Sequence, residues 1–275
     1  MSRVMDKLLA CRFRHPDAAV RLFCFPWAGG GSGYYNNWGK LMPGTVEVYS
    51  LRLPGRETRL KEPCHKTMEA LTNDISTTIL PKLKDKPFAF FGHRCKNGYL
   101  TSVGEFICYF YSMGAFTAFE VARYLQKWYG LQPQHLFVSG VSAPQSPLRY
   151  QKNRQPVFEM SEEAFLDYIR QIGGTPEEIL QNKGMMKLFL PPLRADLELL
   201  DAYNYQIPDS GPELSCPVTC FDGTEDRDHD LDAWAQLTSH SAFQKTKLPG
   251  GHFYLLDKNN QQTLLKHILQ TLENI

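Results

Sequence analysis

The segment Phe88-Ala89-Phe90-Phe91 is a run of four apolar residues followed at once by Gly92-His93. A continuous apolar run of this length is typical of a strand that is buried on both faces, as in a parallel sheet. Five further candidate strands occur along the chain: Val20–Phe25, Val46–Leu51, His135–Gly140, Val218–Asp222 and Gln244–Leu248. Longer amphipathic stretches alternate with these runs, so the sequence predicts an α/β fold with a mostly parallel central sheet.

The amphipathic stretches carry helical signals. Residues Met113–Trp128 place three alanines on one side, where small side chains allow close packing against a sheet. Residues Asn259–Glu273 predict a terminal helix. Residues 151–203 read as all-helical, and Ser161 is well placed to cap a helix there. We expect one domain over residues 1–275, with residues 151–203 forming either a helical lid subdomain over a pocket or a packed peripheral subdomain.

Composition excludes several classes of protein. The chain has 275 residues, 43% hydrophobic and 21% charged, with a net charge of +1, which excludes a disordered chain, a coiled coil and a collagen-like repeat. Without a basic stretch that is interleaved with aromatics, nucleic acid is not an expected partner. We also expect no membrane span, no signal peptide, free thiols among the seven cysteines, and a cytosolic monomer.

A glycine-rich loop directly follows the first long candidate strand. It reads Phe25-Pro26-Trp27-Ala28-Gly29-Gly30-Gly31-Ser32. Consecutive glycines let backbone N–H groups approach a ligand oxygen, so the loop suits a phosphate cradle, an oxyanion hole or a plain flexible turn. Because the Gly-Lys-Ser/Thr of a P-loop is missing, nucleotide phosphate is disfavoured.

A second segment, Tyr111-Ser112-Met113-Gly114, lies between an apolar run and a predicted helix. A serine at a sharp strand-to-helix turn is the nucleophile elbow of the α/β hydrolases, in which the N–H of the following residue faces the developing oxyanion. That geometry gives Ser112 the role of nucleophile and the Met113 N–H the role of oxyanion donor. The alternative is a serine that merely caps the helix.

A third segment, Leu248-Pro249-Gly250-Gly251-His252-Phe253, places His252 on a loop after a late strand, where it suits a general base. Asp226, in the turn after the preceding strand, suits the carboxylate that orients the imidazole. The chain order Ser, Asp, His is that of the α/β hydrolases. The remaining acids of this turn are interpreted as mostly solvated, and the other histidines, His229 included, as structural or surface residues.

Five segments together resemble the type II thioesterases, and within that family the vertebrate medium-chain S-acyl fatty acid synthase thioesterases (oleoyl-ACP hydrolases). They are Leu22–Gly31, Leu51–Glu57, Lys86–His93, Leu193–Asp196 and Leu248–Tyr254. The resemblance implies an α/β-hydrolase fold with Ser112 as nucleophile, His252 as base and Asp226 as its orienting acid. It also implies that the N–H groups of Ala28 and Met113 form the oxyanion hole.

The resemblance further implies release of fatty acids from the acyl-phosphopantetheine carried by the acyl carrier domain of fatty acid synthase, with no metal or organic cofactor. The predicted helical segment would then cover the acyl chain. Its candidate lining residues, which either line a groove or merely pack, are Phe165, Ile169, Ile172 and Leu190. Arg52, Arg56 and Arg59 suit either a docking surface for an acidic carrier domain or solvated and loop-pinning arginines.

The sequence departs from the family at the elbow itself. The family reads Gly-His-Ser-Met-Gly, whereas 18 residues, Arg94–Tyr111, here separate Gly92-His93 from Ser112-Met113-Gly114. In one arrangement, the strand-like end of this insertion, Phe106–Tyr111, replaces the Phe88 strand in the sheet. In the other, the Phe88 strand stays and the insertion bulges out. Both arrangements threaten the placement of the nucleophile, so we expect impaired activity. The alternatives are an inactive carrier-binding protein and an oxygen-ester hydrolase.

Overall fold

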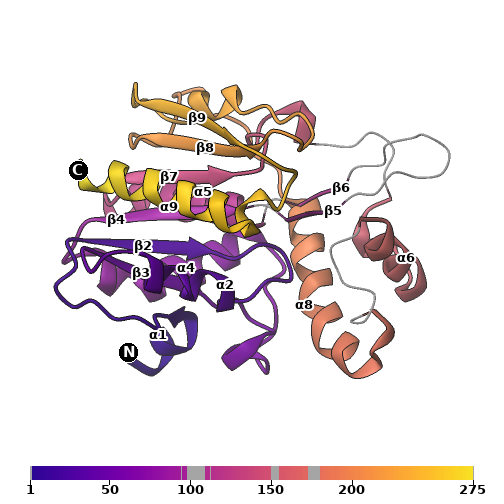
Figure 1. The fold of residues 1–275 in the computed structure, drawn as a ribbon. Helices are drawn as coiled ribbons and strands as arrows, with labels where there is room; N and C mark the ends of the chain where they lie inside the picture. The colour runs from indigo at the N-terminus through magenta and orange to yellow at the C-terminus, as the bar shows by residue number, and fades with distance from the viewer. Residues whose placement is uncertain are drawn as a thin grey trace.

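The structure is a computed structural model that describes residues 2–93, 95–97, 109–111, 113–149, 155–172 and 180–274. Seven strands form one sheet in the order β1-β3-β2-β4-β7-β8-β9, and β5 and β6 form a separate two-stranded sheet (Figure 1). All neighbours in the large sheet are parallel except β1, which runs antiparallel to β3. The strands are β1 (Leu9–Ala10), β2 (Val20–Phe25), β3 (Val46–Leu51), β4 (Phe88–His93), β5 (Cys95–Asn97), β6 (Tyr109–Tyr111), β7 (His135–Ser139), β8 (Val218–Gly223) and β9 (Phe243–Leu248).

The six predicted strands are all present, and the mostly parallel sheet is confirmed. β2 and β3 have the predicted bounds, whereas β4 continues through Gly92 to His93. The sequence did not reveal β1, because a strand of two residues is too short to show a hydrophobic period. The fold class is therefore the one that the apolar runs predict.

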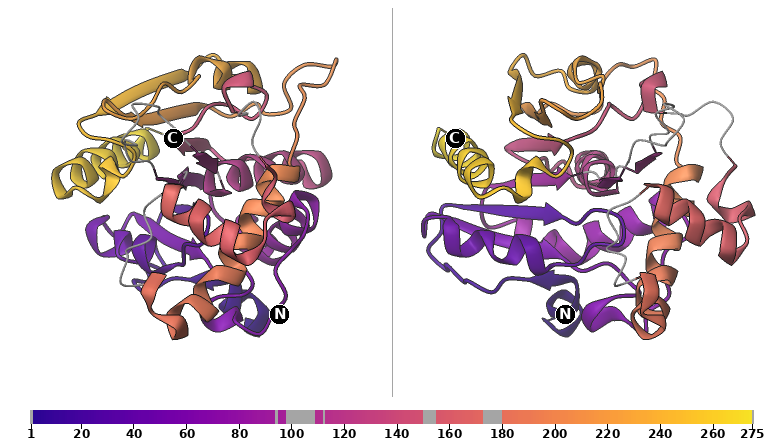
Figure 2. Two further views of the ribbon diagram at one scale, coloured as in Figure 1. Left: turned by 90° about the vertical axis from the view of Figure 1, so that its right-hand side faces the viewer. Right: turned by 45° about the vertical axis from the view of Figure 1, so that its right-hand side comes forward.

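Helices cover both faces of the sheet. The longer helices and those named below are α1 (Ser2–Leu8), α2 (Gly33–Asn36), α3 (Trp38–Leu41), α4 (Met68–Leu83), α5 (Met113–Tyr129), α6 (Glu162–Ile172), α8 (Lys183–Ala202) and α9 (Lys258–Glu273). Alternate side chains of β2 point to opposite faces. Phe23 and Phe25 pack in the core with α4 and α5, and Leu22 and Cys24 pack in the core with α2, α3 and α9. In Figure 2, left, α9 and the α4–α5 pair lie on opposite sides of the sheet.

Helices α6 and α8 lie beyond the carboxyl ends of the parallel strands (Figures 1 and 2). Helix α6 begins after Ser161, whose hydroxyl accepts a hydrogen bond from the Ala164 N–H at 3.1 Å, so the predicted cap is confirmed. In the sequence, Thr175-Pro176-Glu177-Glu178 also predicts the start of a helix, with proline at its first position, but these residues lie outside the described ones. The two described helices of residues 151–203 therefore flank the edge at which active sites of open α/β sheets form.

The structure decides between the two arrangements of the insertion. Phe88–His93 remains in the large sheet between β2 and β7, as in the second of the two arrangements, so the alternative in which Phe106–Tyr111 takes its place is wrong. Residues Tyr109–Tyr111 do form a strand, but they pair antiparallel with β5. The register sets Cys95 opposite Tyr111, which brings the two ends of the insertion side by side. The chain therefore leaves the sheet after β4 and returns close to its point of departure.

The amino end of α5 is held against the carboxyl end of β4 by direct backbone contact. A Cβ atom added to Gly92 would lie 2.3 Å from the Gly114 carbonyl oxygen and 2.6 Å from the Ala115 Cα. One added to Gly114 would lie 2.5 Å from the Phe25 carbonyl oxygen and 2.6 Å from that of His93. Only glycine fits at both positions, so the close approach of strand and helix survives the insertion between them.

Two expectations from the sequence concern membrane-spanning helices and the state of the cysteines. Across the described ranges, no helix combines the length and the apolarity that crossing a membrane requires. Cys11, Cys24, Cys64, Cys216 and Cys220 are free thiols. The expectation of free thiols is thus confirmed for these five cysteines.

We predict that Gly92→Ala destabilises the protein by about 1–3 kcal/mol or more, because the atoms that the new methyl group meets are backbone and cannot move independently. The free energy of unfolding from urea titration measures this loss. Gly33→Ala is the matched control, since its Cβ meets nothing within 4 Å and alanine favours the helix there. Equal stability of the two variants would contradict the proposed contact.

Candidate active site

An acid and a histidine meet at the carboxyl edge of the sheet, at the ends of two neighbouring strands. Asp226 follows β8 and His252 follows β9, and the parallel pairing of these strands brings the two loops together. His252 Nδ1 lies 2.5 Å from Asp226 Oδ2, and the two side chains are 5% and 0% exposed. The other oxygen of Asp226 accepts the Arg227 N–H at 2.8 Å. The carboxylate is thus fixed to accept a proton-bearing Nδ1, which leaves Nε2 as the basic nitrogen.

A second histidine supports the first. The rings of His93, at the end of β4, and His252 are stacked with centroids 4.9 Å apart. His93 Nδ1 lies 2.8 Å from the Ser139 hydroxyl, which lies 2.6 Å from the Tyr254 hydroxyl. Gly140, which has φ +66°, makes room for the imidazole, because a Cβ there would lie 2.8 Å from His252 Cε1. Sequence reasoning missed this support, since nothing in the sequence shows which strand ends meet.

The candidate nucleophile, Ser112, lies outside the described residues. Its neighbourhood is described on both sides. Helix α5 begins at Met113, whose side chain is buried, and the next residue, Gly114, packs on the backbone of His93. The ring of His93 in turn stacks on His252. The amino end of α5 and the Asp226–His252 pair are therefore assembled at one place, and the Met113 N–H is at the end of the helix that carries positive partial charge.

The glycine-rich loop is fastened by a buried ion pair. Arg56 donates to both oxygens of Asp196 on α8 at 2.8 Å and to the Gly30 carbonyl oxygen at 3.1 Å. Asp196 also accepts the Gly29 N–H at 2.9 Å. The loop that contains Ala28, itself 4% exposed, is therefore held between the segment after β3 and helix α8.

Of the two interpretations of the arginines, the structure supports the pinning of loops for two of them. Arg56 and Arg59 are both 7% exposed, and Arg59 donates to Glu62 at 2.8 Å and to Asp74 at 2.9 Å. Arg52 is half-buried and bonds to the backbone of Asp6 at 3.0 Å. These arginines are thus engaged within the chain.

The predicted acyl-lining residues are distributed over the helices at this edge. Phe165 and Ile169 are fully buried in the main core, Leu190 is partly buried against it, and the side chain of Ile172 lies outside the described part. Two apolar residues of α8 that the sequence analysis did not propose as acyl-lining residues pack next to Gly29 of the glycine-rich loop. Leu193 Cδ1 would lie 2.9 Å, and Phe189 Cε2 3.3 Å, from a Cβ on Gly29.

His229, which the sequence indicated to be a structural or surface residue, is a buried one next to the acid. Its Nδ1 lies 3.0 and 3.1 Å from the two oxygens of Asp222, the fifth residue of β8, and its side chain is fully buried. It also lies 4.0 Å from Asp226 Oδ2. Burial, and then the charge of Asp226, raise the pKa of Asp222 to about 7. The ligand atoms of Asp222, Asp226 and His229 lie within 4.8 Å of one another, but their bonds within the cluster account for this spacing without a metal.

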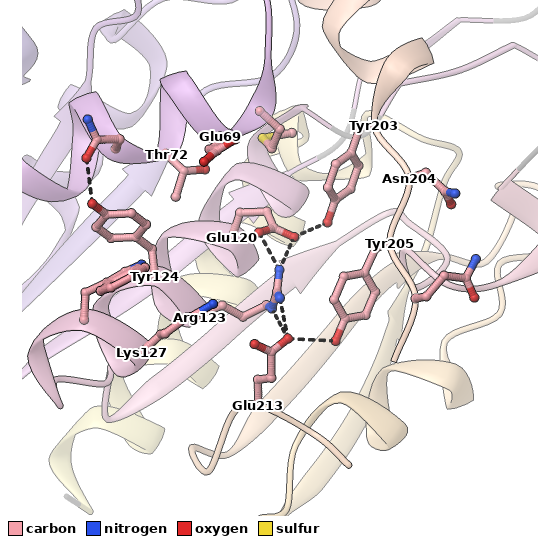
Figure 3. Close-up of a pocket in the computed structure, with 14 residues that line it drawn as sticks. Glu69, Thr72, Glu120, Arg123, Tyr124, Lys127, Tyr203, Asn204, Tyr205 and Glu213 are labelled. Atoms are coloured by element: carbon pink, nitrogen blue, oxygen red, sulfur yellow. Dashed lines mark hydrogen bonds and ion pairs between the residues drawn. The ribbon is translucent and has the colours of Figure 1, made fainter. Parts of the chain in front are cut away.

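A cavity of about 610 Å³ opens between α4, α5 and the segment after α8 (Figure 3). Arg123 crosses it between Glu120, at 2.6 Å, and Glu213, to which its Nε donates at 2.7 Å. Tyr203 and Tyr205 hydrogen-bond to the same two carboxylates. The cavity shares no residue with the Asp226–His252 pair, and its ion pairs tie the segment after α8 to α5.

The sheet, with an acid after β8 and a histidine after β9, defines an α/β hydrolase. The sequence profile of the thioesterase domain matches residues 20–94 and 111–272, which is most of the chain. The chain belongs to this thioesterase family. The profile leaves residues 95–110 unmatched, which is where the sequence indicates an insertion.

Individual relatives agree with the family profile. The medium-chain S-acyl fatty acid synthase thioesterase of Homo sapiens is 37% identical over 268 residues, covering 98% of this chain and 93% of that protein. Among solved structures, the type II thioesterase BorB from the borrelidin biosynthetic cluster has a TM-score of 0.76 at 28% identity, with 97% and 98% of the two chains covered. Human thioesterase 2 has a TM-score of 0.67 at 31% identity, with 93% and 97% covered.

We predict that Arg56→Met costs about 3–5 kcal/mol of stability, because it leaves the Asp196 carboxylate buried without its cation. Urea titration of the variant measures the loss. Arg170→Met is the control: it removes an arginine from an ion pair with Asp167 that is about half exposed, and should cost less than about 1 kcal/mol. A similar, small loss in both variants would show that the buried pair does not hold the loop.

Proposed function

We propose that the chain is a serine thioesterase that hydrolyses medium- or long-chain acyl thioesters carried by the acyl carrier domain of fatty acid synthase. The observation that carries the proposal is the buried hydrogen bond of 2.5 Å between Asp226 and His252, next to the amino end of α5. Ser112 is the residue that directly precedes α5 in the chain. Membership of the thioesterase family adds the class of bond that is cleaved.

In the proposed mechanism, Ser112 attacks the thioester carbonyl carbon while His252 Nε2 takes up its proton. The N–H groups of Ala28 and Met113 stabilise the oxyanion of the tetrahedral intermediate. His252 then gives the proton to the departing thiolate, which leaves an acyl-serine. A water molecule, deprotonated by the same histidine, hydrolyses this ester, and the proton returns to Ser112. Asp226 stabilises the imidazolium at each stage.

The substrate class rests on relatives and on the residues beside the loop. The human relative is named for the thioester of fatty acid synthase and for medium chains. Phe189 and Leu193 form an apolar wall next to Gly29, which suits the first carbons of an acyl chain. We assign α6 and α8 the role of a lid, and we propose Phe165, Ile169 and Leu190 on these helices as residues that face the acyl chain. Ile172 stays a candidate from the sequence alone. An acyl-phosphopantetheine arm would enter at this edge of the sheet.

The insertion is expected to slow the reaction. In an uninterrupted elbow, the serine is joined to the strand on one side and to the helix on the other, and both connections fix its hydroxyl. Here Ser112 follows a strand that belongs to the small β5–β6 sheet. Only the connection to α5 remains as in the family. A displacement of about 1 Å at such a position can cost about 100-fold in rate.

We predict that a variant lacking Arg94–Tyr111, which joins His93 directly to Ser112, hydrolyses decanoyl-CoA about 100-fold faster than the full chain. Release of free CoA measured with a thiol reagent gives the rates. Ser112→Ala in each background is the control and should abolish turnover. Equal rates in the two backgrounds would contradict the proposed impairment. Failure of both to hydrolyse acyl-CoA or acyl-carrier thioesters, with carrier binding retained, would favour a binding function.

We predict that Asp226→Asn lowers kcat by about 10⁴-fold in the more active of the two backgrounds, because the imidazole loses its fixed tautomer and the partner of its cation. The rate of thiol release from the thioester at saturating substrate concentration gives kcat. Asp232→Asn is the matched control, since this carboxylate is 78% exposed and pairs only with the surface Lys245 in the part of the chain that is described. A small effect of Asp226→Asn would remove this residue from the triad.

A further inference from the structure

Four buried ionisable side chains form one cluster at the ends of β8 and β9. Asp226 and His252 make up the proposed catalytic pair, and Asp222 and His229 lie beside them. The side chains of Asp222, Asp226 and His229 have no exposed surface, and that of His252 is 5% exposed. The proposed mechanism uses only the first pair. Asp222 and His229 have no part in that mechanism.

The two pairs share one atom as their common neighbour. Asp226 Oδ2 lies 2.5 Å from His252 Nδ1 and 4.0 Å from His229 Nδ1. The two imidazole rings have centroids 6.4 Å apart and are inclined by 63°. Both histidines turn Nδ1 towards a carboxylate, that of Asp222 in β8 for His229 and that of Asp226 after β8 for His252. The arrangement thus repeats the acid–imidazole pairing of the proposed triad at a distance where charges interact directly.

We propose that Asp222 and His229 are positioning residues for the Asp226–His252 pair, a second acid–imidazole pair whose charge couples to the base through the shared neighbour Asp226 Oδ2. This inference rests on the proposed function, because it assigns His252 as the base. With both carboxylates ionised and both rings neutral, the buried cluster carries two negative charges. One proton held by the Asp222–His229 pair removes one of them, and the protons of such a cluster titrate as a unit.

Other ionisable groups also lie near Asp222 and influence its charge. Besides the cluster, its ionisable neighbours are Lys247 on β9, Cys220 on its own strand and Tyr254 of the turn before α9. Lys247 is exposed and lowers the pKa of Asp222, whereas burial and Asp226 raise it to about 7. Against the base itself, the ring of His93 stacks on His252. Asp222 therefore changes charge in the pH range in which a histidine base also titrates.

The decisive variant is Asp222→Asn, which keeps the size of the side chain and removes its charge. The imidazolium of His252 then loses a nearby carboxylate, so the acid limb of kcat/KM against pH should move to lower pH by on the order of one unit. Hydrolysis of a soluble decanoyl thioester of N-acetylcysteamine gives this profile. Asp230→Asn is the control in the same loop: Asp230 accepts from Ser146 at 2.7 Å but is not in the cluster.

A merely structural role of the pair predicts a different result. Asp222→Asn would then lower stability or kcat and leave the midpoint of the profile where it is in the wild type. An unchanged midpoint, or one that moves to higher pH, overturns the proposal. An equal shift in Asp230→Asn also overturns it, because the effect would then belong to the loop and not to the cluster.

A titration of the imidazole ¹⁵N resonances of the full chain decides the matter without turnover. In the wild type, His229 and His252 should each show two coupled steps, and in Asp222→Asn the His252 midpoint should fall. Independent single steps for both rings in the wild type overturn the inference, even where the variant does not fold. If no thioester is hydrolysed while the coupled titration is seen, the proposed function fails and the coupling stands.

Discussion

The contact between the backbones of Gly92 and Gly114 is the constraint on which the architecture of the site depends. It joins the end of β4 to the start of α5, and it also brings Gly114 against the carbonyl oxygen of Phe25 at the end of β2. In an uninterrupted elbow, chain connectivity and packing both enforce this approach. Here packing alone does so, because 18 residues separate His93 from Ser112. Packing between the buried faces of β4 and α5 thus suffices to hold the helix in place against the sheet.

From that contact outward, the site is built as layers of buried polar groups. His93 stacks on His252, Asp226 fixes His252, and the Asp222–His229 pair lies behind Asp226. Within each acid–imidazole pair, one partner offsets the cost of burying the other, since an ionisable side chain without a partner is expensive at this depth. The same principle holds the glycine-rich loop through the Arg56–Asp196 ion pair. A change to one member therefore reaches the candidate catalytic residues even when it lies outside them.

The sequence predicted what local patterns determine. Short runs rich in Phe, Val and Leu indicated most of the six long strands, although β9 (Phe243–Leu248) is largely polar. The order of Ser112, Asp226 and His252 pointed to an α/β hydrolase, and the structure brings the last two together. It did not predict the pairing of Arg56 with Asp196, because residues 140 positions apart meet only through the fold. It did not predict the pairing of His229 with Asp222 either, because the course of the turn that joins them is not visible in the sequence. The location of the insertion was readable from the interrupted motif. Its pairing with itself and not with the large sheet was not, since Phe106–Tyr111 has the composition of a buried strand.

An insertion at this position separates stability from catalysis. The stability of the fold depends on faces of β4 and α5 that bury large apolar side chains, such as Phe90 and Phe116, and those faces are intact. Catalysis depends on the position of one hydroxyl, which tolerates far less displacement than the core does. The register of β5 and β6 sets Tyr111, the last residue of the insertion, opposite Cys95, near its start. The insertion therefore closes on itself without pulling β4 from α5. A scaffold of this kind can therefore persist as a folded thioesterase-family protein whatever its rate of turnover.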